Sequence, residues 1–160
     1  MLAATGRAPQ RRNRTAPPAI PATLRGAPCR VRARPYGTTV AISVVRRYRF
    51  EAAHRLAWHP GKCRRLHGHS YVLEVEVAGP LDDRGVVIDF DEVDEVDEVV
   101  AGAVLGGPDG LDHADLNERL PNPTAELVAV LVGERLDAAG LRWSRLRLWE
   151  TEDGSVVLER

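Results

Sequence analysis

The sequence predicts an α+β domain: a four-stranded antiparallel sheet covered on one side by two helices, in the order ββααββ. Three observations support this fold class. Two segments early in the patterned region alternate apolar and polar residues, as half-buried strands do. Two later segments repeat apolar residues at helical spacing. Two short alternating segments then close the chain, which predicts a final hairpin.

The patterned region follows a long basic segment. Residues 1–49 contain eleven arginines and no acidic residue, whereas all 23 acidic residues lie from Glu51 onward. Residues 1–42 are rich in Arg and Pro and lack periodicity, so we expect a disordered extension there. A nucleic-acid-binding arm is the functional alternative, but no aromatic pattern supports it. An organellar transit peptide or a start codon assigned too far upstream would leave a similar composition.

We expect the function to reside in one domain over residues 43–160. The chain has 160 residues, 44% hydrophobic and 28% charged, which is typical of a globular protein that buries a core. No apolar run approaches the roughly 18 residues that cross a bilayer, so no membrane span is expected. The two cysteines, Cys29 and Cys63, lie in segments of different character. A disulfide is therefore not expected, and a reducing, cytoplasmic location fits better.

The first two strands are expected near residues 43–56 and 67–77. The apolar face of the first strand carries Tyr48, Phe50, Ala52, His54 and Leu56. The apolar face of the second strand carries Leu73, Val75 and Val77, with glutamates between them.

Two helices are expected to follow. The first begins at Asp89, a suitable N-cap with Glu92 as its capping-box partner, and ends before GGPDG. The second begins in NPTAELVAVLVGERL, with Asn122 as the cap and Pro123 at the first helical position, and ends near Gly140. Strands in LRWSRLRLWET and SVVLE then complete the sheet. Its open edges favour an oligomer.

Three histidines are expected to converge at one end of this sheet. A strand has a side-chain period of two, so His67 and His69 share a face, and His54 lies on the apolar face of the preceding strand. Any one of them alone is better explained as a core histidine with a hydrogen-bond partner. A shared divalent metal accounts for all three together, and three histidines with an open fourth position match catalytic zinc.

Cys63 has two possible roles beside such a site. It lies four residues before His67 in a basic loop, which favours its thiolate. As a fourth ligand it would close the site and make it structural, whereas as a free thiolate it would act as a base. Spacing alone does not separate these roles.

Three further polar residues are candidates for the site. Asp112 and His113 lie together in LDHADLN, where a helix start with a capping aspartate is the ordinary explanation. Glu150 continues the inward face of the third strand, so its carboxylate must be paired or await a ligand. Such a carboxylate can accept two hydrogen bonds from a guanidine-like edge, for example N3 and the 2-amino group of a pterin. His59 has no comparable context and is expected to lie in a loop.

The motifs FEAAHRL, CRRLHGHSY, VIDF, LDHADLN, NPTAE and WET, in this order, resemble the 6-pyruvoyl-tetrahydropterin synthase family. The resemblance covers about residues 45–160 and is closest to the bacterial 6-carboxy-5,6,7,8-tetrahydropterin synthase branch of the queuosine pathway. It implies the tunnelling fold (T-fold), in which strands of several subunits form a barrel with active sites at subunit interfaces. A homohexamer is the expected assembly, with no nucleic-acid or membrane partner.

The resemblance also implies roles for the candidate residues. Zn²⁺ would be held by His54, His67 and His69. Cys63 would be the proton-abstracting thiol, Glu150 would anchor the pterin and join the charge relay, and Asp112 and His113 would be relay partners from a neighbouring subunit.

The reaction implied converts 7,8-dihydroneopterin triphosphate to 6-carboxy-5,6,7,8-tetrahydropterin, with release of acetaldehyde and triphosphate. Zinc would lower the pKa of the side-chain hydroxyls. The short CRRL spacing favours this branch over the animal-type pyruvoyl synthases, and Cys63 argues against a branch that carries glutamate there. The alternatives are 6-pyruvoyl-tetrahydropterin synthase and a non-catalytic zinc-stabilised binding module with Cys63 as fourth ligand.

Overall fold

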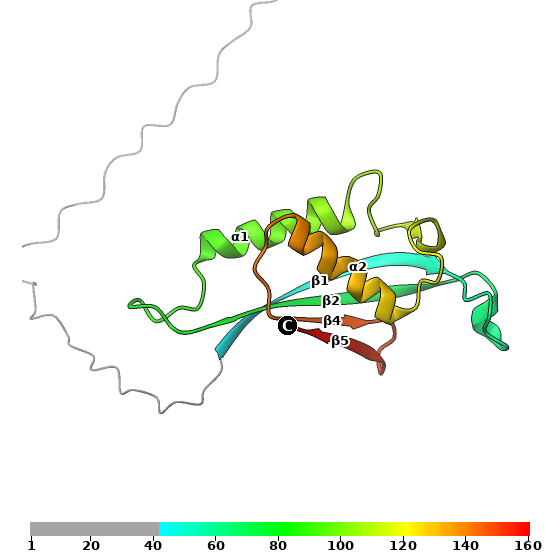
Figure 1. The fold of residues 1–160 in the computed structure, drawn as a ribbon, viewed down its shortest axis with the longest axis horizontal. Helices are drawn as coiled ribbons and strands as arrows, with labels where there is room; N and C mark the ends of the chain where they lie inside the picture. The colour runs from blue at the N-terminus through cyan, green and yellow to red at the C-terminus, as the bar shows by residue number, and fades with distance from the viewer. Residues whose placement is uncertain (1–41) are drawn as a thin grey trace, which may run out of the picture. The chain divides into compact units, whose positions relative to one another are not determined.

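The structure, a computed structural model, describes residues 42–160 (Figure 1). The predicted disordered extension over residues 1–42 lies outside this range, apart from Ile42. The described elements follow in the order β1 (Ile42–His54), η2 (Lys62–Arg64), β2 (His67–Gly79), α1 (Phe90–Val99), η3 (Val100–Leu105), β3 (Ala114–Asp115), η4 (Leu116–Glu118), α2 (Ala125–Ala138), β4 (Arg145–Trp149) and β5 (Ser155–Glu159).

The sheet has five strands in the order β3-β1-β2-β4-β5. Antiparallel pairing joins β1 to β2, β2 to β4 and β4 to β5, as predicted. The predicted four-stranded, purely antiparallel sheet is corrected by β3, which pairs in parallel with Ala52 and Ala53 at the edge of β1. Two residues are too few to display the alternation by which a strand is recognised in a sequence.

Both helices lie on the same side of the sheet (Figure 1). The sheet face beneath them is apolar, and Phe50 of β1 stacks on Tyr71 of β2 with ring centroids 4.9 Å apart. Leu146 and Leu148 of β4 are fully buried in the same core, as their alternation predicts. Within residues 42–160, neither helix combines the length and apolar character needed to cross a membrane.

The two helix starts differ in how well they were predicted. The capping box of α1 is confirmed, with the Glu92 carboxylate accepting from the Asp89 amide at 2.8 Å. The prediction that α2 starts at Asn122 is wrong. Thr124 is the N-cap, and its hydroxyl accepts from the Leu127 amide at 3.4 Å. The Asn122 side chain instead accepts from the indole N–H of Trp58 at 2.8 Å.

A polar contact ties α1 to β1. Asp97 accepts hydrogen bonds from Nε of Arg46 at 3.0 Å and from the Tyr48 hydroxyl at 2.6 Å. The Arg46 guanidinium lowers the pKa of Asp97 below its ordinary value of 3.8, and the Tyr48 hydroxyl adds to this effect. The ionised carboxylate therefore contributes stability above pH 4, and that contribution disappears as the pH falls through the folded-state pKa.

We predict that Asp97→Asn lowers the free energy of unfolding by about 1 kcal/mol at pH 7, a value that allows for solvent screening of this half-exposed contact. Denaturant unfolding from pH 7 to pH 2.5 would measure the difference, which should shrink below pH 4 as Asp97 of the wild type protonates. Asp94→Asn, on the exposed side of α1, is the matched control and should change stability little. A pH-independent difference would contradict the role of the ionised carboxylate.

Candidate functional site

The paired ends of β1 and β2 bring three imidazoles together. His54 lies directly opposite His67 in the antiparallel register, and His69 follows on the same face. One ring nitrogen from each of the three lies within 4.8 Å of the others. The ring centroids are 4.7 to 5.1 Å apart, so the predicted convergence of the three side chains is confirmed.

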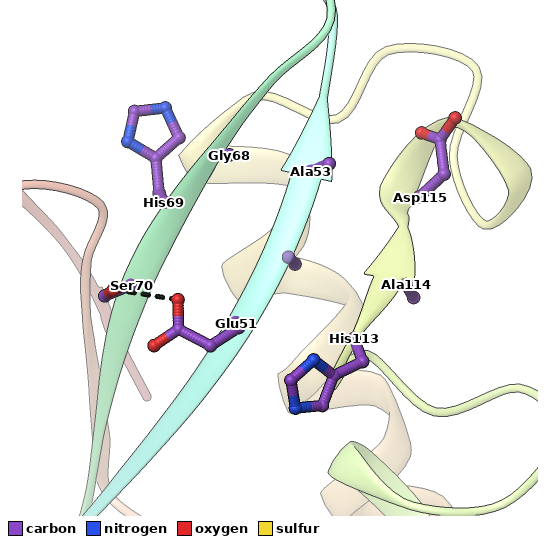
Figure 2. Close-up of a pocket in the computed structure, with 9 residues that line it drawn as sticks. Glu51, Ala53, Gly68, His69, Ser70, His113, Ala114 and Asp115 are labelled. Carbon is purple, nitrogen blue, oxygen red and sulfur yellow. Dashed lines mark hydrogen bonds between the residues drawn. The ribbon is translucent and has the colours of Figure 1, made fainter.

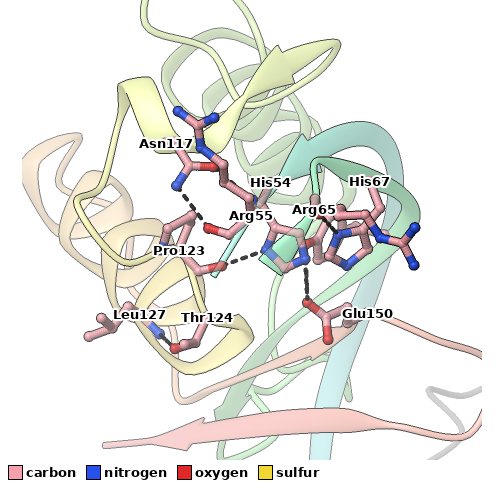
Figure 3. Close-up of polar contacts among 10 residues, drawn as sticks. His54, Arg55, Arg65, His67, Asn117, Pro123, Thr124, Leu127 and Glu150 are labelled. Atoms are coloured by element: carbon pink, nitrogen blue, oxygen red, sulfur yellow. Dashed lines mark hydrogen bonds and ion pairs between the residues drawn. The ribbon is translucent and has the colours of Figure 1, made fainter. Parts of the chain in front are cut away.

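Backbone carbonyls orient two of these rings. Nδ1–H of His54 donates to the Pro123 carbonyl at 2.7 Å, and Nδ1–H of His67 donates to the Arg65 carbonyl at 2.8 Å (Figure 3). A carbonyl only accepts, so Nδ1 carries a proton in both rings, and Nε2 is the nitrogen on the side available to a ligand. Ligand histidines in metal sites are commonly held in this way.

His69 provides a second reason to expect a cation. Its Nε2 is buried and has no hydrogen-bond partner among the described residues. Burial lowers the pKa of His69, while the Glu150 carboxylate opposes the shift, so the ring favours its neutral, metal-binding form. Three converging imidazoles match the donor set of a three-histidine zinc site with an open fourth position.

Glu150, directly after β4, borders the triad. One carboxylate oxygen lies 3.5 Å from Nε2 of His54 (Figure 3). The same oxygen accepts from the Tyr71 hydroxyl at 3.3 Å. Burial raises the pKa of Tyr71, so this hydroxyl keeps its proton and remains a donor. Glu150 itself is 30% exposed, which leaves its carboxylate accessible to a ligand.

Tyr71 was missed as a site residue in the sequence. It lies two positions after His69, so extending the period-two face of His67 and His69 by one step would have found it.

Cys63 shares a pocket with the triad and Glu150. The pocket is lined by His54, Leu56, Lys62, Cys63, Arg65, Leu66, His67, His69, Glu150 and Thr151. The half-buried thiol is free, and the loop that carries it is closed by a hydrogen bond from the Leu56 amide to the Cys63 carbonyl at 2.8 Å. In residues 42–160, the potential metal-ligand cluster contains the three histidines without Cys63.

Asp112 and His113 lie elsewhere in the protomer. His113 lines a second pocket with Glu51 and Ser70, and this pocket includes His69 of the triad but not the thiol (Figure 2). It is 78% exposed and has a φ of 56°, in the left-handed region that a non-glycine residue rarely adopts. Its amide donates to the Glu51 carbonyl at 2.6 Å.

The interpretation of Asp112 as a helix cap is wrong. Its carboxylate accepts from the Glu51 amide at 2.9 Å and so fastens the segment to the edge of β1. The capping aspartate of η4 is Asp115, which accepts from the Asn117 amide at 3.0 Å. Asp112 and His113 both lie outside the Cys63 pocket of their own protomer.

The sequence is similar to a known family of proteins. The family model for 6-pyruvoyl tetrahydropterin synthase matches residues 43–160. A putative 6-carboxy-5,6,7,8-tetrahydropterin synthase of Archaeoglobus fulgidus is 37% identical over 69% of this chain and 90% of that protein. A dihydroneopterin monophosphate aldolase of Pyrococcus furiosus is 35% identical over 72% of this chain and 96% of that protein.

The fold has a counterpart among solved structures. The 6-pyruvoyl tetrahydropterin synthase of Caenorhabditis elegans superposes with a TM-score of 0.61, covering 76% of this chain and 96% of that chain. The two sequences are 23% identical, so this likeness concerns the fold.

We predict that His69→Ala lowers zinc content from about one ion per chain to well below that, because it removes the buried unpartnered nitrogen. Zinc at 100 times its Kd should stabilise the wild type by about 2.7 kcal/mol and the variant far less. Metal analysis and thermal unfolding with and without a chelator would measure both effects. His59→Ala, in the loop outside the cluster, is the control, and equal zinc loss in both variants would contradict the assignment.

Proposed function

The chain belongs to the 6-pyruvoyl tetrahydropterin synthase family, and on this premise we propose that it is a zinc-dependent 6-carboxy-5,6,7,8-tetrahydropterin synthase. Its curated relatives make it an enzyme of the pterin-processing lyase type. The proposed substrate is 7,8-dihydroneopterin triphosphate. The products are 6-carboxy-5,6,7,8-tetrahydropterin, acetaldehyde and triphosphate, and the atoms balance with uptake of a water molecule.

The observation that carries this proposal is the single pocket shared by the triad, Cys63 and Glu150. A metal site, a free thiol and a partly exposed carboxylate there supply a Lewis acid, a base and an anchor for the substrate. A purely structural zinc site would need neither a free thiol nor an accessible carboxylate. Cys63 lies outside the ligand cluster of residues 42–160, which favours the base over the fourth ligand.

Each group has a role that its surroundings support. Zinc held by His54, His67 and His69 would supply Lewis-acid stabilisation to the hydroxyl oxygens of the substrate side chain. Glu150 would accept hydrogen bonds from N3 and the 2-amino group of the pterin, which fixes the ring and its side chain relative to the pocket. Cys63 would then take a proton from the side-chain carbon. Tyr71 donates to Glu150 and keeps its carboxylate oriented.

We further propose that Asp112 and His113 act on a site in a neighbouring subunit. They directly precede β3 at the edge of the sheet, and neither lines the pocket of their own thiol. The outer edges of β3 and β5 are unpaired in the described protomer, so copies that pair along these edges would form a barrel. A homohexamer of this kind would bring an exposed imidazole to a partner's pocket.

A second candidate function is suggested by the relative in Pyrococcus furiosus, which is named dihydroneopterin monophosphate aldolase. In that function the substrate would be dihydroneopterin monophosphate instead of the triphosphate. Elimination of triphosphate alone, giving 6-pyruvoyltetrahydropterin, is a further outcome within the same family. The products distinguish all three reactions.

We predict that purified zinc-loaded protein converts dihydroneopterin triphosphate to acetaldehyde and 6-carboxytetrahydropterin. Mass spectrometry of the products would measure this conversion. 6-Pyruvoyltetrahydropterin as the only product would support the pyruvoyl synthase instead. Turnover of the monophosphate alone would support the aldolase. No turnover of either substrate would sink the proposal and favour a non-catalytic zinc module.

We also predict that Cys63→Ala lowers kcat by at least about 100-fold and leaves zinc content unchanged, since general-base catalysis contributes 10²–10⁴-fold. Metal analysis on the same sample as the kinetic assay separates the two roles of the thiol. Lost zinc would identify Cys63 as a structural ligand. Cys63→Ser is a companion variant that retains a small polar group in the loop.

A further inference from the structure

Two cationic side chains in the triad pocket have no role in the chemistry described above. Lys62, at the start of η2, and Arg65, directly after it, both line the pocket that contains the triad. Both are exposed, and neither forms an ion pair with the residues that the structure describes. The pocket therefore contains two uncompensated positive charges.

The loop does not need these side chains to hold its shape. Its turn is closed by backbone hydrogen bonds, from the Arg64 amide to the Gly61 carbonyl at 3.2 Å and from the Arg65 amide to the Lys62 carbonyl at 3.1 Å. The Gly61 amide also donates to Nδ1 of His59 at 3.0 Å. The charged ends of Lys62 and Arg65 thus remain free to contact a ligand.

The charges of the pocket are separated in a way that suits one class of ligand. Among residues 42–160, the one carboxylate that lines the pocket is Glu150, which contacts Tyr71 and His54 and forms no ion pair with the two cations. A matching ligand has a hydrogen-bond-donating edge for the carboxylate and an anionic tail for the cations. Arg favours phosphate oxygens through its planar fork, and Lys provides a compact point charge.

We propose that Lys62 and Arg65 form the subsite for the polyphosphate tail of the substrate. The identity of the ligand rests on the proposed function, whereas the anion site itself rests on the two unpaired cations in the pocket. This subsite would select among phosphorylated pterins by the length of their phosphate chain.

A different explanation is that the basic loop only favours the thiolate of Cys63. Arg64 separates the two explanations, because it follows Cys63 in the chain but is not among the residues that line the pocket. A general electrostatic effect on the thiol would include Arg64. A phosphate subsite would depend on Lys62 and Arg65 alone.

The test uses the full chain loaded with zinc and its variants Lys62→Gln, Arg65→Gln and Arg64→Gln, which remove equal charge. Calorimetric titration with inorganic triphosphate, pyrophosphate and orthophosphate measures binding without turnover. We expect Lys62→Gln and Arg65→Gln each to weaken triphosphate binding about five- to tenfold, with smaller losses for shorter anions, and Arg64→Gln to remain within about twofold. With dihydroneopterin triphosphate, KM should rise in the first two variants while kcat changes little.

Three results would overturn the subsite. They are unchanged triphosphate affinity in Lys62→Gln and Arg65→Gln, equal losses in all three variants, and a fall in kcat and in thiol alkylation rate without a change in KM. Triphosphate binding that depends on Lys62 and Arg65 without turnover of the pterin would support the anion subsite while rejecting the proposed reaction. Turnover with no dependence on the two cations would do the opposite.

Discussion

The antiparallel register between β1 and β2 is the constraint on which the candidate site depends. The two strands pair without interruption from Ile42 opposite Gly79 to His54 opposite His67. If β2 shifted by one residue against β1, every side chain of β2 would turn to the other face of the sheet. His67 and His69 would then lie on the opposite face from His54, and the apolar core residues of β2 would be exposed. The same apolar contacts that stabilise the sheet therefore keep the imidazoles on one face. Burial of the core and convergence of the three imidazoles are two results of a single register.

Other segments refine what the register brings together. The Pro123 carbonyl orients His54, and it is free to do so because α2 begins only after Thr124, whose hydroxyl takes the Leu127 amide. In a helix that began at Pro123, this carbonyl would accept from Leu127 instead. The start of α2 thus determines the proton position on a ring of the sheet. On the other side, Glu150 links the end of β4 to the triad.

Features with a local or periodic cause could be predicted from the sequence. Alternation identified the long strands and the shared face of the histidines, and the spacing of Asp89 and Glu92 identified the first helix start. The cap of α2 was predicted wrongly, because Asn122 is as good a cap as Thr124 and its contact with the distant Trp58 indole has no local signal. β3 has two residues, too few to show the alternation of a strand. The left-handed backbone at His113 directs the segment along the edge of β1, and it could not be predicted because such backbone is usually marked by glycine.

The hydrogen bond between the Leu56 amide and the Cys63 carbonyl closes the neck of the loop that carries the thiol. Residues between these two positions form a tip whose length has little influence on where the thiol lies, because the neck fixes the end of the loop. Residues between Cys63 and His67 have no such freedom, since they set the offset between the thiol and the histidine cluster directly. Insertions and deletions should therefore be tolerated before the cysteine, whereas after it they would change the distance from the thiol to the histidines. The length of the segment before Cys63 can thus vary without displacing the thiol, provided that the end carrying Lys62 is kept, whereas the length of the segment after Cys63 cannot vary.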